Sequence, residues 1–202
     1  MGKLFVIMGK SATGKDHIYR AVVEQCPVPL KTVIPYTTRP MRANETEGVE
    51  YRFVTEKQLS EMREAGKLIE VRSYQTVRGL WSYFTADDGQ IDLESGSSIL
   101  IGTPEAYRQI RDFFGAERVV PLYIEVDDES RLLRAIKREQ KQEKPDYQEL
   151  CRRFLADSED FNDEVLNGLG IRKRFENQDL EQCIREVITE IGKEIWQDSN
   201  RS

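Results

Sequence analysis

Uninterrupted apolar runs and amphipathic stretches alternate along this chain. Short runs dominated by aliphatic residues occupy residues 4–8, 97–101 and 119–126, and a shorter strand-like piece covers 31–34. Apolar residues at helical spacing lie after residue 15, over 104–114 and over 180–196. Continuous apolar runs are typical of strands buried on both faces, and strands that alternate with helices form parallel sheets. The pattern therefore predicts an α/β fold with a mostly parallel sheet flanked by helices.

Further helices are expected in two strongly polar parts of the chain. Residues 56–68 place Leu59 and Met62 on one side, which predicts a helix with one buried face. Residues 129–143 are strongly charged and helical in pattern, and a second helix starts near residue 147. Pro145 separates the two, because proline interrupts a helix.

The composition is that of one highly charged globular domain. The 202 residues include 39% hydrophobic and 33% charged side chains, enough apolar material for one core. The formal net charge of −6 argues against a general nucleic-acid-binding protein. Three widely spaced cysteines suggest neither a disulfide framework nor a zinc site, and no apolar run is long enough to span a bilayer. We therefore expect a cytoplasmic protein without a membrane partner.

The strongest chemical signal is GKSATGK at residues 9–15, between the first apolar run and the first helix. Two glycines separated by four residues and followed by lysine form the phosphate-binding loop, whose backbone N–H groups surround phosphate oxygens. The helix that follows directs its positive end at the same anion. The expected donor-nucleotide residues are Gly9, Lys10, Ser11, Ala12, Thr13, Gly14 and Lys15. A glycine-containing turn with a surface lysine is the alternative.

Residue 16 departs from this motif. A serine or threonine normally follows the lysine and ligates Mg²⁺ through its hydroxyl, whereas this chain has Asp16. A carboxylate is also a hard oxygen ligand, so Asp16 is a candidate metal ligand. Its negative charge would also oppose the phosphates, and the sequence leaves both effects open.

A second polar segment reads TTRPMR at residues 37–42 and continues to Tyr51, Phe53 and Val54. Its arginines offer rigid forks of donors that suit a phosphate, and a polar surface loop is the alternative. The segment resembles the signature of the guanylate kinase family, and the upstream phosphate loop fits the order of that family. The resemblance extends over nearly the whole chain. It implies one domain of residues 1–202, with a core of 1–35, 96–127 and 159–202, a monophosphate-binding subdomain of 36–95 and a helical lid of 128–158.

The resemblance also assigns an acceptor site. It implies that arginines and tyrosines clamp the acceptor phosphate and that Glu70 accepts hydrogen bonds from the edge of guanine. The residues assigned in this way are Thr38, Arg39, Arg42, Glu45, Tyr51, Glu70, Tyr83, Thr85 and Thr103. Two base-reading features of the family are missing, because Pro35 stands in place of a serine and Ile101 and Thr103 stand in place of an acidic pair. An insertion is expected at residues 77–81, ahead of Tyr83.

The charged helices carry arginines that resemble those of the family's lid. Arg134 and Arg138 match an Arg-x-x-x-Arg spacing, and Arg153 matches an arginine of the following helix. The implied catalytic set is Lys15, Arg39, Arg134, Arg138 and Arg153. Asn177 matches an asparagine that lies near the adenine nucleotide in the family.

Solvated helix surfaces with ion pairs between residues four apart are the alternative for such charges. We expect that ordinary role for three residues of the charged helix, Arg131, Lys137 and Lys141.

The resemblance implies phosphoryl transfer from ATP, with Mg²⁺, to a nucleoside monophosphate, most directly GMP or dGMP. The departures at Pro35 and Thr103 leave open a kinase of another phosphorylated small molecule, for example a ribose bisphosphate. A third hypothesis is a binding module that has lost catalysis, which the intact Gly9, Gly14 and Lys15 disfavour. The expected partners are ATP and a nucleoside monophosphate, without nucleic acid, and the sequence leaves the oligomeric state open.

Overall fold

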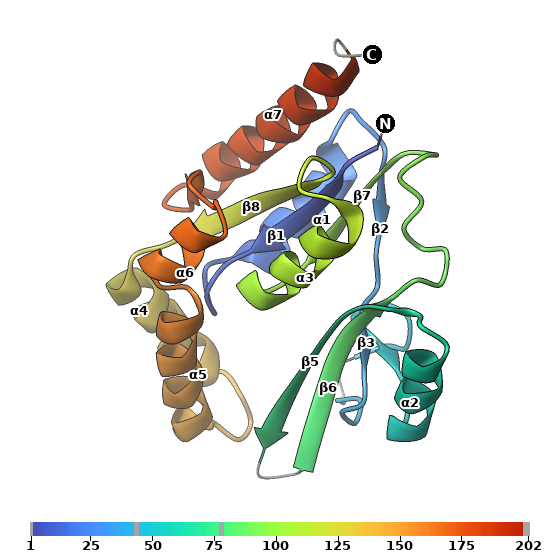
Figure 1. The fold of residues 1–202 in the computed structure, drawn as a ribbon. Coiled ribbons are helices and arrows are strands. Elements are labelled where there is room, and N and C mark those ends of the chain that lie inside the picture. The colour runs from blue at the N-terminus through green and yellow to red at the C-terminus, as the bar shows by residue number, and fades with distance from the viewer. Residues whose placement is uncertain (1, 43–44, 77–78, 200–202) are drawn as a thin grey trace.

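The computed structural model describes residues 2–42, 45–76 and 79–199. Two sheets organise these residues, and Figure 1 shows the larger sheet above the smaller one. The strands are β1 (Leu4–Met8), β2 (Leu30–Thr32), β3 (Tyr36–Thr37), β4 (Arg52–Phe53), β5 (Leu68–Thr76), β6 (Gly79–Ala86), β7 (Ser97–Ile101), β8 (Val119–Glu125) and β9 (Arg174–Glu176). The helices are α1 (Lys15–Gln25), α2 (Glu56–Glu64), α3 (Pro104–Phe114), α4 (Asp128–Glu139), α5 (Tyr147–Asp160), α6 (Asp163–Gly168) and α7 (Leu180–Ser199).

The larger sheet has the strand order β2-β7-β1-β8-β9, and each neighbouring pair is parallel. Strand β1 lies in the centre, where Leu4 is level with Ser98 of β7 on one side and Val119 of β8 on the other. All five residues of β1 are buried, as a continuous apolar run predicts for a central parallel strand. The predicted α/β fold with a mostly parallel sheet is confirmed.

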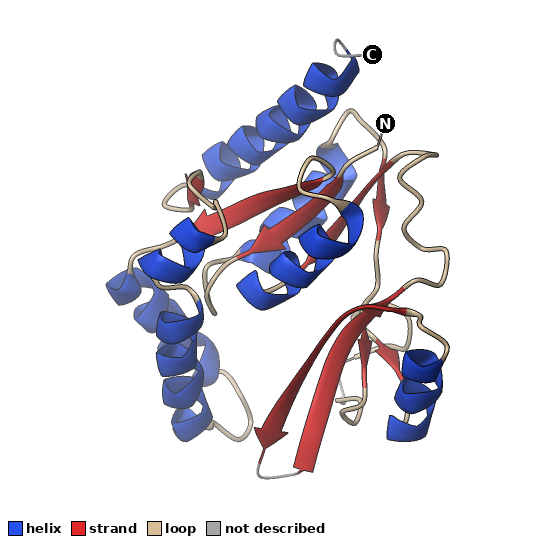
Figure 2. Ribbon diagram, viewed as in Figure 1, coloured by secondary structure: helices blue, strands red, loops and turns tan. Residues whose placement is uncertain are grey.

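Helices cover both faces of this sheet, and successive residues of β1 point to opposite faces. Phe5 and Ile7 pack in a cluster with α1 and α7, whereas Leu4 and Val6 pack in a cluster with α3 and α6. Figure 2 shows these helices on the two sides of the sheet. The sheet is therefore a rigid central layer, and the loops at the carboxyl ends of its strands hold fixed positions.

The smaller sheet has the strand order β4-β3-β6-β5 and lies between β2 and β7 in the chain. Its long hairpin pairs β5 with β6 in antiparallel register from Leu68 and Ala86 to Thr76 and Gly79. Helix α2 covers one side, where Leu59, Tyr36 and Phe84 share a small core.

Several predicted boundaries need correction. Within the segment 77–81, where the resemblance predicts an insertion, Leu80 and Trp81 belong to β6 and continue its ladder, whereas Val77 and Arg78 lie outside the described residues. The helix expected over 56–68 stops at Glu64, because Gly66 adopts a left-handed conformation (φ 68°) and the N–H of Lys67 bonds back to Met62.

Three further boundaries also differ from the pattern. Strand β2 starts and ends earlier than the expected 31–34, and α4 ends at Glu139 rather than at residue 143. Helix α6 was not expected, although Asn162 caps it by accepting the N–H of Val165. It is too short to show a helical period in the sequence.

Candidate functional site

The phosphate loop joins β1 to α1 and has the geometry that its glycines allow. Gly14 adopts a left-handed conformation (φ 85°), and its carbonyl accepts the first N–H groups of α1, from His17 at 3.0 Å and Ile18 at 3.1 Å. A Cβ on Gly9 would come within 2.8 Å of the Ile124 carbonyl oxygen. Gly9 is therefore required by close packing, and Gly14 by a conformation that other residues adopt only with strain. The positive end of α1 faces the loop.

Asn177 lies immediately after β9, and its side chain holds the phosphate loop in place. Its side-chain amide donates to the Thr13 carbonyl at 2.7 Å, and its backbone N–H donates to the Glu125 carbonyl at 2.9 Å. Its own carbonyl accepts Arg134 Nη2 at 3.0 Å. Asn177 is only 4% exposed, so these bonds lie in a poorly solvated environment. The residue expected near the donor nucleotide thus connects the phosphate loop to the sheet and to α4.

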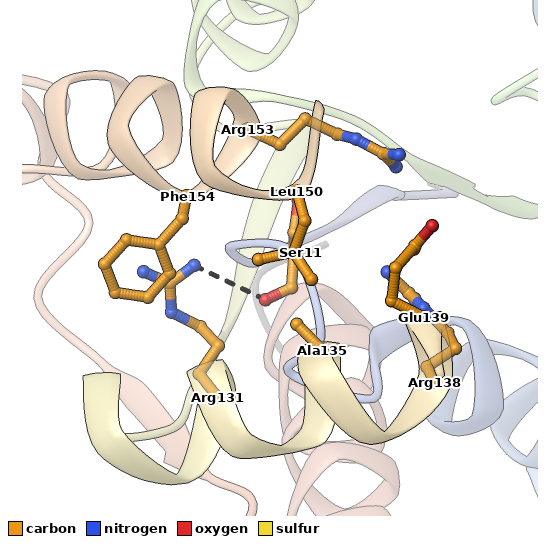
Figure 3. Close-up of a pocket in the computed structure, with 8 residues that line it drawn as sticks. All are labelled: Ser11, Arg131, Ala135, Arg138, Glu139, Leu150, Arg153 and Phe154. Atoms are coloured by element: carbon orange, nitrogen blue, oxygen red, sulfur yellow. Dashed lines mark hydrogen bonds between the residues drawn. The ribbon is translucent and has the colours of Figure 1, made fainter. Parts of the chain in front are cut away.

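Arg131 corrects the sequence interpretation. It was expected to be solvated, but its side chain is 1% exposed and faces the phosphate loop. Its guanidinium donates to Asp128 Oδ1 at 2.9 Å, to Asp157 Oδ2 at 3.1 Å and to the Ser11 carbonyl at 3.4 Å. It also stacks 4.1 Å from the centre of the Phe154 ring, as Figure 3 shows. An expected surface charge is therefore the centre of a buried network.

Asp157 connects α5 directly to the phosphate loop. Its Oδ2 accepts the backbone N–H of Ser11 at 2.7 Å as well as Arg131. A carboxylate thus occupies a backbone donor of the loop that is predicted to bind phosphate. Sequence reasoning missed Asp157. The only local signal for a network around Arg131 was weak, because Asp128 and Arg131 are three residues apart on α4 and exposed ion pairs share this spacing.

The three predicted lid arginines also lie close to the loop. Arg134 donates to Asn177, while Arg138 and Arg153 line the same small cavity as Ser11. The cavity measures about 10 Å³, room for about one water molecule. In Figure 3, Arg138 and Arg153 lie at the end opposite Arg131 and Phe154. The structure therefore gathers Arg131, Arg134, Arg138 and Arg153 around one side of the phosphate loop.

Arg42 lies within electrostatic reach of Glu149 on α5. A hydrogen bond from Arg152 lowers the pKa of Glu149 on α5, and the charges of Arg153 and Arg42 lower it further. Arg42 itself is exposed, and its backbone N–H donates to Glu45 Oε2 at 2.8 Å. The charge of Arg42, in the loop after β3, is therefore felt on α5, the helix that carries Arg153.

Arg39 is a buried cation that lies just after β3. Its guanidinium holds Glu45 with two hydrogen bonds of 2.7 and 2.5 Å and lies 5.1 Å from the centre of the Tyr51 ring. Tyr51 in turn contacts Tyr83 edge-to-face, with ring centres 5.7 Å apart. The hydrogen bond from Arg39 lowers the pKa of Glu45 to about 2. Thr38, next to Arg39, exchanges two hydrogen bonds with the backbone of Ser82 and fixes this segment to β6.

One face of the β5–β6 hairpin carries the other expected acceptor residues. In the antiparallel register Glu70 is level with Thr85, and Arg72 is level with Tyr83. Paired residues project to the same face, so these four side chains form one surface. Glu70 is 2% exposed, and its Oε1 accepts the Thr85 hydroxyl at 3.0 Å. Tyr83 and Thr85 are thereby brought beside Tyr51 and Glu70, respectively.

Thr103 connects this hairpin to the core. It caps α3 by accepting the Ala106 N–H, and its hydroxyl also accepts Arg72 Nη1 at 3.1 Å. Tyr74 and Thr103 border a cleft of about 510 Å³ between β5, α3 and α6. Most ionisable side chains lining the cleft are acidic, and burial together with nearby Asp157 raises the pKa of Asp160 there.

Asp16 is exposed in the first turn of α1, directly after Lys15. Within the described ranges, no group of three or more histidine, cysteine, aspartate or glutamate side chains is arranged to hold a metal ion. None of the helices in the described part of the chain is long and apolar enough to cross a membrane.

The fold and the site define a class of protein. A parallel sheet with a glycine-rich loop at the carboxyl end of its central strand, followed by a helix, is the architecture of a P-loop phosphate-binding protein. The guanylate kinase family model matches residues 1–187. This chain therefore belongs to the guanylate kinase family.

Individual relatives agree with this assignment. A guanylate kinase of Nocardia farcinica is 44% identical over 69 residues, which is 34% of this chain and 35% of the relative. A guanylate kinase of Granulibacter bethesdensis is 34% identical over 116 residues, which is 54% of this chain and 50% of the relative. The chain thus spans half or less of the length of these two curated relatives.

The fold also matches a solved structure. The crystal structure of guanylate kinase from Anaplasma phagocytophilum superimposes with a TM-score of 0.64 over 96% of this chain and 86% of that chain. Its sequence identity to this chain is 16%, so the likeness concerns the fold.

Proposed function

We propose that this protein transfers the γ-phosphoryl group of ATP to a nucleoside monophosphate, with GMP and dGMP as the first candidates. The observation that carries the proposal is the presence of two separate elements that carry arginines. One is the phosphate loop with the arginines of α4 and α5 beside it, and the other is the smaller sheet with Arg39 and Arg42. A kinase for small phosphorylated acceptors needs both, because the donor and the acceptor each carry phosphate.

On the donor side, the loop backbone and Lys15 would hold the β- and γ-phosphates. Asn177 supports this role by fixing the Thr13 carbonyl at 2.7 Å, so the loop keeps its shape with little reorganisation. When bound, Mg²⁺ would neutralise phosphate charge, with Asp16 as its protein ligand. Asp157 would release the Ser11 N–H when phosphate enters.

On the acceptor side, Arg39, Arg42, Tyr51 and Tyr83 would hold the monophosphate. The pair formed by Arg39 and Glu45 fixes the Arg39 guanidinium before the ligand arrives, which lowers the entropy lost on binding. Glu70, Thr85 and Thr103 would contact the base. The division into a core, a subdomain of 36–95 and a lid of 128–158 belongs to the same proposal.

Positioning and charge stabilisation would provide the rate acceleration. Arg134, Arg138 and Arg153 would approach the transferring group and exclude water as α4 and α5 close. Phosphoryl transfer demands little covalent chemistry from the protein, so arginines and one lysine are the kind of groups that the reaction needs. The proposed setting is cytoplasmic, with ATP and a nucleoside monophosphate as the partners.

The test is ADP release from Mg-ATP in the presence of GMP, dGMP, AMP, UMP or CMP, with Lys15→Ala as the blank. We expect activity with the guanine nucleotides and a loss of about a hundredfold or more in Lys15→Ala, because a charge that stabilises the transition state is removed. Lys57→Ala is the matched control, since Lys57 lies on the exposed surface of α2 and its side chain is 86% exposed. Normal turnover by Lys15→Ala would show that the donor site is assigned wrongly. ATP binding without transfer to any nucleotide would favour another acceptor or a binding role.

A further inference from the structure

One carboxylate oxygen beside the phosphate loop lies where two hydrogen-bond donors converge. Asp157 Oδ2 accepts the backbone N–H of Ser11 at 2.7 Å and Arg131 Nη1 at 3.1 Å. The Asp157 side chain is 16% exposed, so both bonds lie in a largely buried setting. Backbone N–H groups of a glycine-rich loop and guanidinium groups are typical donors to phosphate oxygens. The position of Asp157 Oδ2 therefore has the donor set of a phosphate-oxygen site.

The Arg131 guanidinium is also held by a group other than Asp157. Its Nε and Nη2 donate to Asp128 Oδ1 at 3.2 and 2.9 Å, and Asp128 lies three residues earlier on the same helix. These bonds leave Nη1 for the phosphate loop, where it also donates to the Ser11 carbonyl at 3.4 Å (Figure 3). Arg131 therefore stays directed at the loop when Asp157 moves away.

Burial requires that another anion take the place of Asp157. The Arg131 side chain is 1% exposed, and a buried charge that loses a partner is destabilising because it is left uncompensated. The adjoining cavity of about 10 Å³ has room for about one water molecule, which is less than a phosphate group needs. A donor phosphate therefore exchanges with the Asp157 carboxylate and does not bind beside it.

This exchange has a consequence for affinity. The bond from Ser11 to Asp157 stabilises the nucleotide-free loop, because a poorly solvated N–H is satisfied. A ligand that needs the same N–H binds only the molecules in which it is free, and its apparent Kd rises as that fraction falls. Asp157 lies on α5, so the exchange also connects the occupancy of the loop to this helix.

We propose that Asp157 is an internal substitute for a donor phosphate, and that Arg131 is a phosphate-binding residue that exchanges Asp157 for a phosphate oxygen when ATP binds. The inference rests on the donor half of the proposed function. It predicts that Asp157 competes with ATP, so that removal of its charge tightens ATP binding. A pair that only supports the loop predicts the opposite, because its loss would distort the loop and weaken binding.

The experiment measures the binding of Mg-ATP by calorimetry in the absence of an acceptor, so that its result does not depend on turnover. The proteins are the wild type, Asp157→Asn, Arg131→Lys and Glu159→Gln. Asp157→Asn replaces the anion by a neutral group of the same size, and Arg131→Lys keeps a charge but loses the planar fork. Glu159→Gln is the matched control, because it removes one negative charge from an exposed position of the same helix.

We expect Asp157→Asn to lower the Kd for ATP by about tenfold, the effect of removing a competitor that leaves about a tenth of the molecules free. Arg131→Lys should raise the Kd by about tenfold, because a charge-assisted hydrogen bond to phosphate is lost. Glu159→Gln should change the Kd by less than about twofold, since the charge of an exposed group is screened. Thermal melting shows which variants are folded, and each folded variant decides by the sign of its effect.

A further measurement needs no variant. In a crystal structure of the wild type with a non-hydrolysable ATP analogue, we expect a phosphate oxygen within hydrogen-bond distance of both Ser11 N and Arg131 Nη1, with Asp157 displaced. Asp157 still bonded to the Ser11 N–H beside a bound analogue would overturn the inference.

The binding data overturn the inference if folded Asp157→Asn binds ATP no more tightly than the wild type or than Glu159→Gln, or if folded Arg131→Lys binds it no more weakly than the wild type. Any of these results with normal phosphoryl transfer by the wild type overturns the inference alone. The expected changes in Kd without phosphoryl transfer to any nucleotide overturn the proposed function alone. Failure of the wild type to bind ATP overturns both.

Discussion

Replacing Arg131 by methionine tests the buried network beside the phosphate loop. The substitution keeps an unbranched side chain over Phe154 but removes a charge that is 1% exposed. The bond to Asp157, whose side chain is 16% exposed, is a charge-assisted hydrogen bond in a largely buried setting and contributes about 1.5–3 kcal/mol. The pair with Asp128, whose side chain is 56% exposed, contributes at most about 1 kcal/mol. We expect Arg131→Met to lower the free energy of unfolding by about 3 kcal/mol.

A loss of that size is readily measured. For a protein of this length, about 3 kcal/mol lowers the melting temperature by about 6–12 °C. Urea denaturation of the same samples gives the free energy directly. Lys137→Met is the matched control, because Lys137 is an exposed cation on the same helix, and its effect should stay within about 0.5 kcal/mol.

A double-mutant cycle attributes the loss to the contact with Asp157. Asp157→Asn keeps the shape of the side chain and removes its charge, so Arg131→Met should be less destabilising in that background. The coupling energy should be about 1–3 kcal/mol. If Arg131→Met were as stable as Lys137→Met, or if the coupling were zero, the reasoning about this network would be refuted.

Three other substitutions test the site. Gly14→Ala should raise the Kd for ATP at least about tenfold, because the added Cβ would lie 2.6 Å from Asn177 Nδ2 and residue 14 would have to keep a left-handed conformation. Gly192→Ala is the control: its Cβ would have open space around it, so ATP binding should not change. Asn177→Asp should lower the free energy of unfolding in urea by about 2–3 kcal/mol, since an acceptor oxygen would face the Thr13 carbonyl. Asn167→Asp, at an exposed position, is its control, and equal stabilities of the two variants would contradict the expectation. The pKa of Glu45 is lowered from 4.5 to about 2, so its carboxylate stabilises the fold above pH 4.5, and this contribution is lost as the pH falls toward 2. The stability difference between the wild type and Glu45→Gln should therefore be largest at pH 7 and shrink at pH 3, and a constant difference would argue against this role of Arg39.

The fold was predictable where one local signal determined the structure. The run at residues 4–8 is apolar at every position, and burial on both faces of a parallel sheet is what such a run allows. Helix α3 was expected at 104–114 and forms over Pro104–Phe114, with proline in its first turn. The end of α2 was missed because Gly66 stops the helix although the residues beyond it continue a helical pattern.

The site was predictable where the chemistry belongs to the backbone of one contiguous segment. The phosphate loop is of this kind, because glycine spacing constrains its path directly. Arg131 and Lys137 look alike in the sequence, and only the packing of α5 against α4 makes one of them buried. Asp157 and Arg72 acquire their partners through contacts between distant elements, for which spacing along the chain gives no signal.

The smaller sheet leaves and rejoins the core through two neighbouring strands. Tyr36 at the start of β3 is level with Phe84 near the end of β6, and their rings stack with centres 5.0 Å apart. The chain between Tyr36 and Phe84 is therefore one continuous segment whose two ends lie side by side. In engineering terms, the smaller sheet is an exchangeable segment: an exchange at these two strands replaces one surface with another and leaves the phosphate loop and the parallel sheet untouched. Chimeras that carry this segment from other proteins of the fold would test the acceptor role that we propose for it.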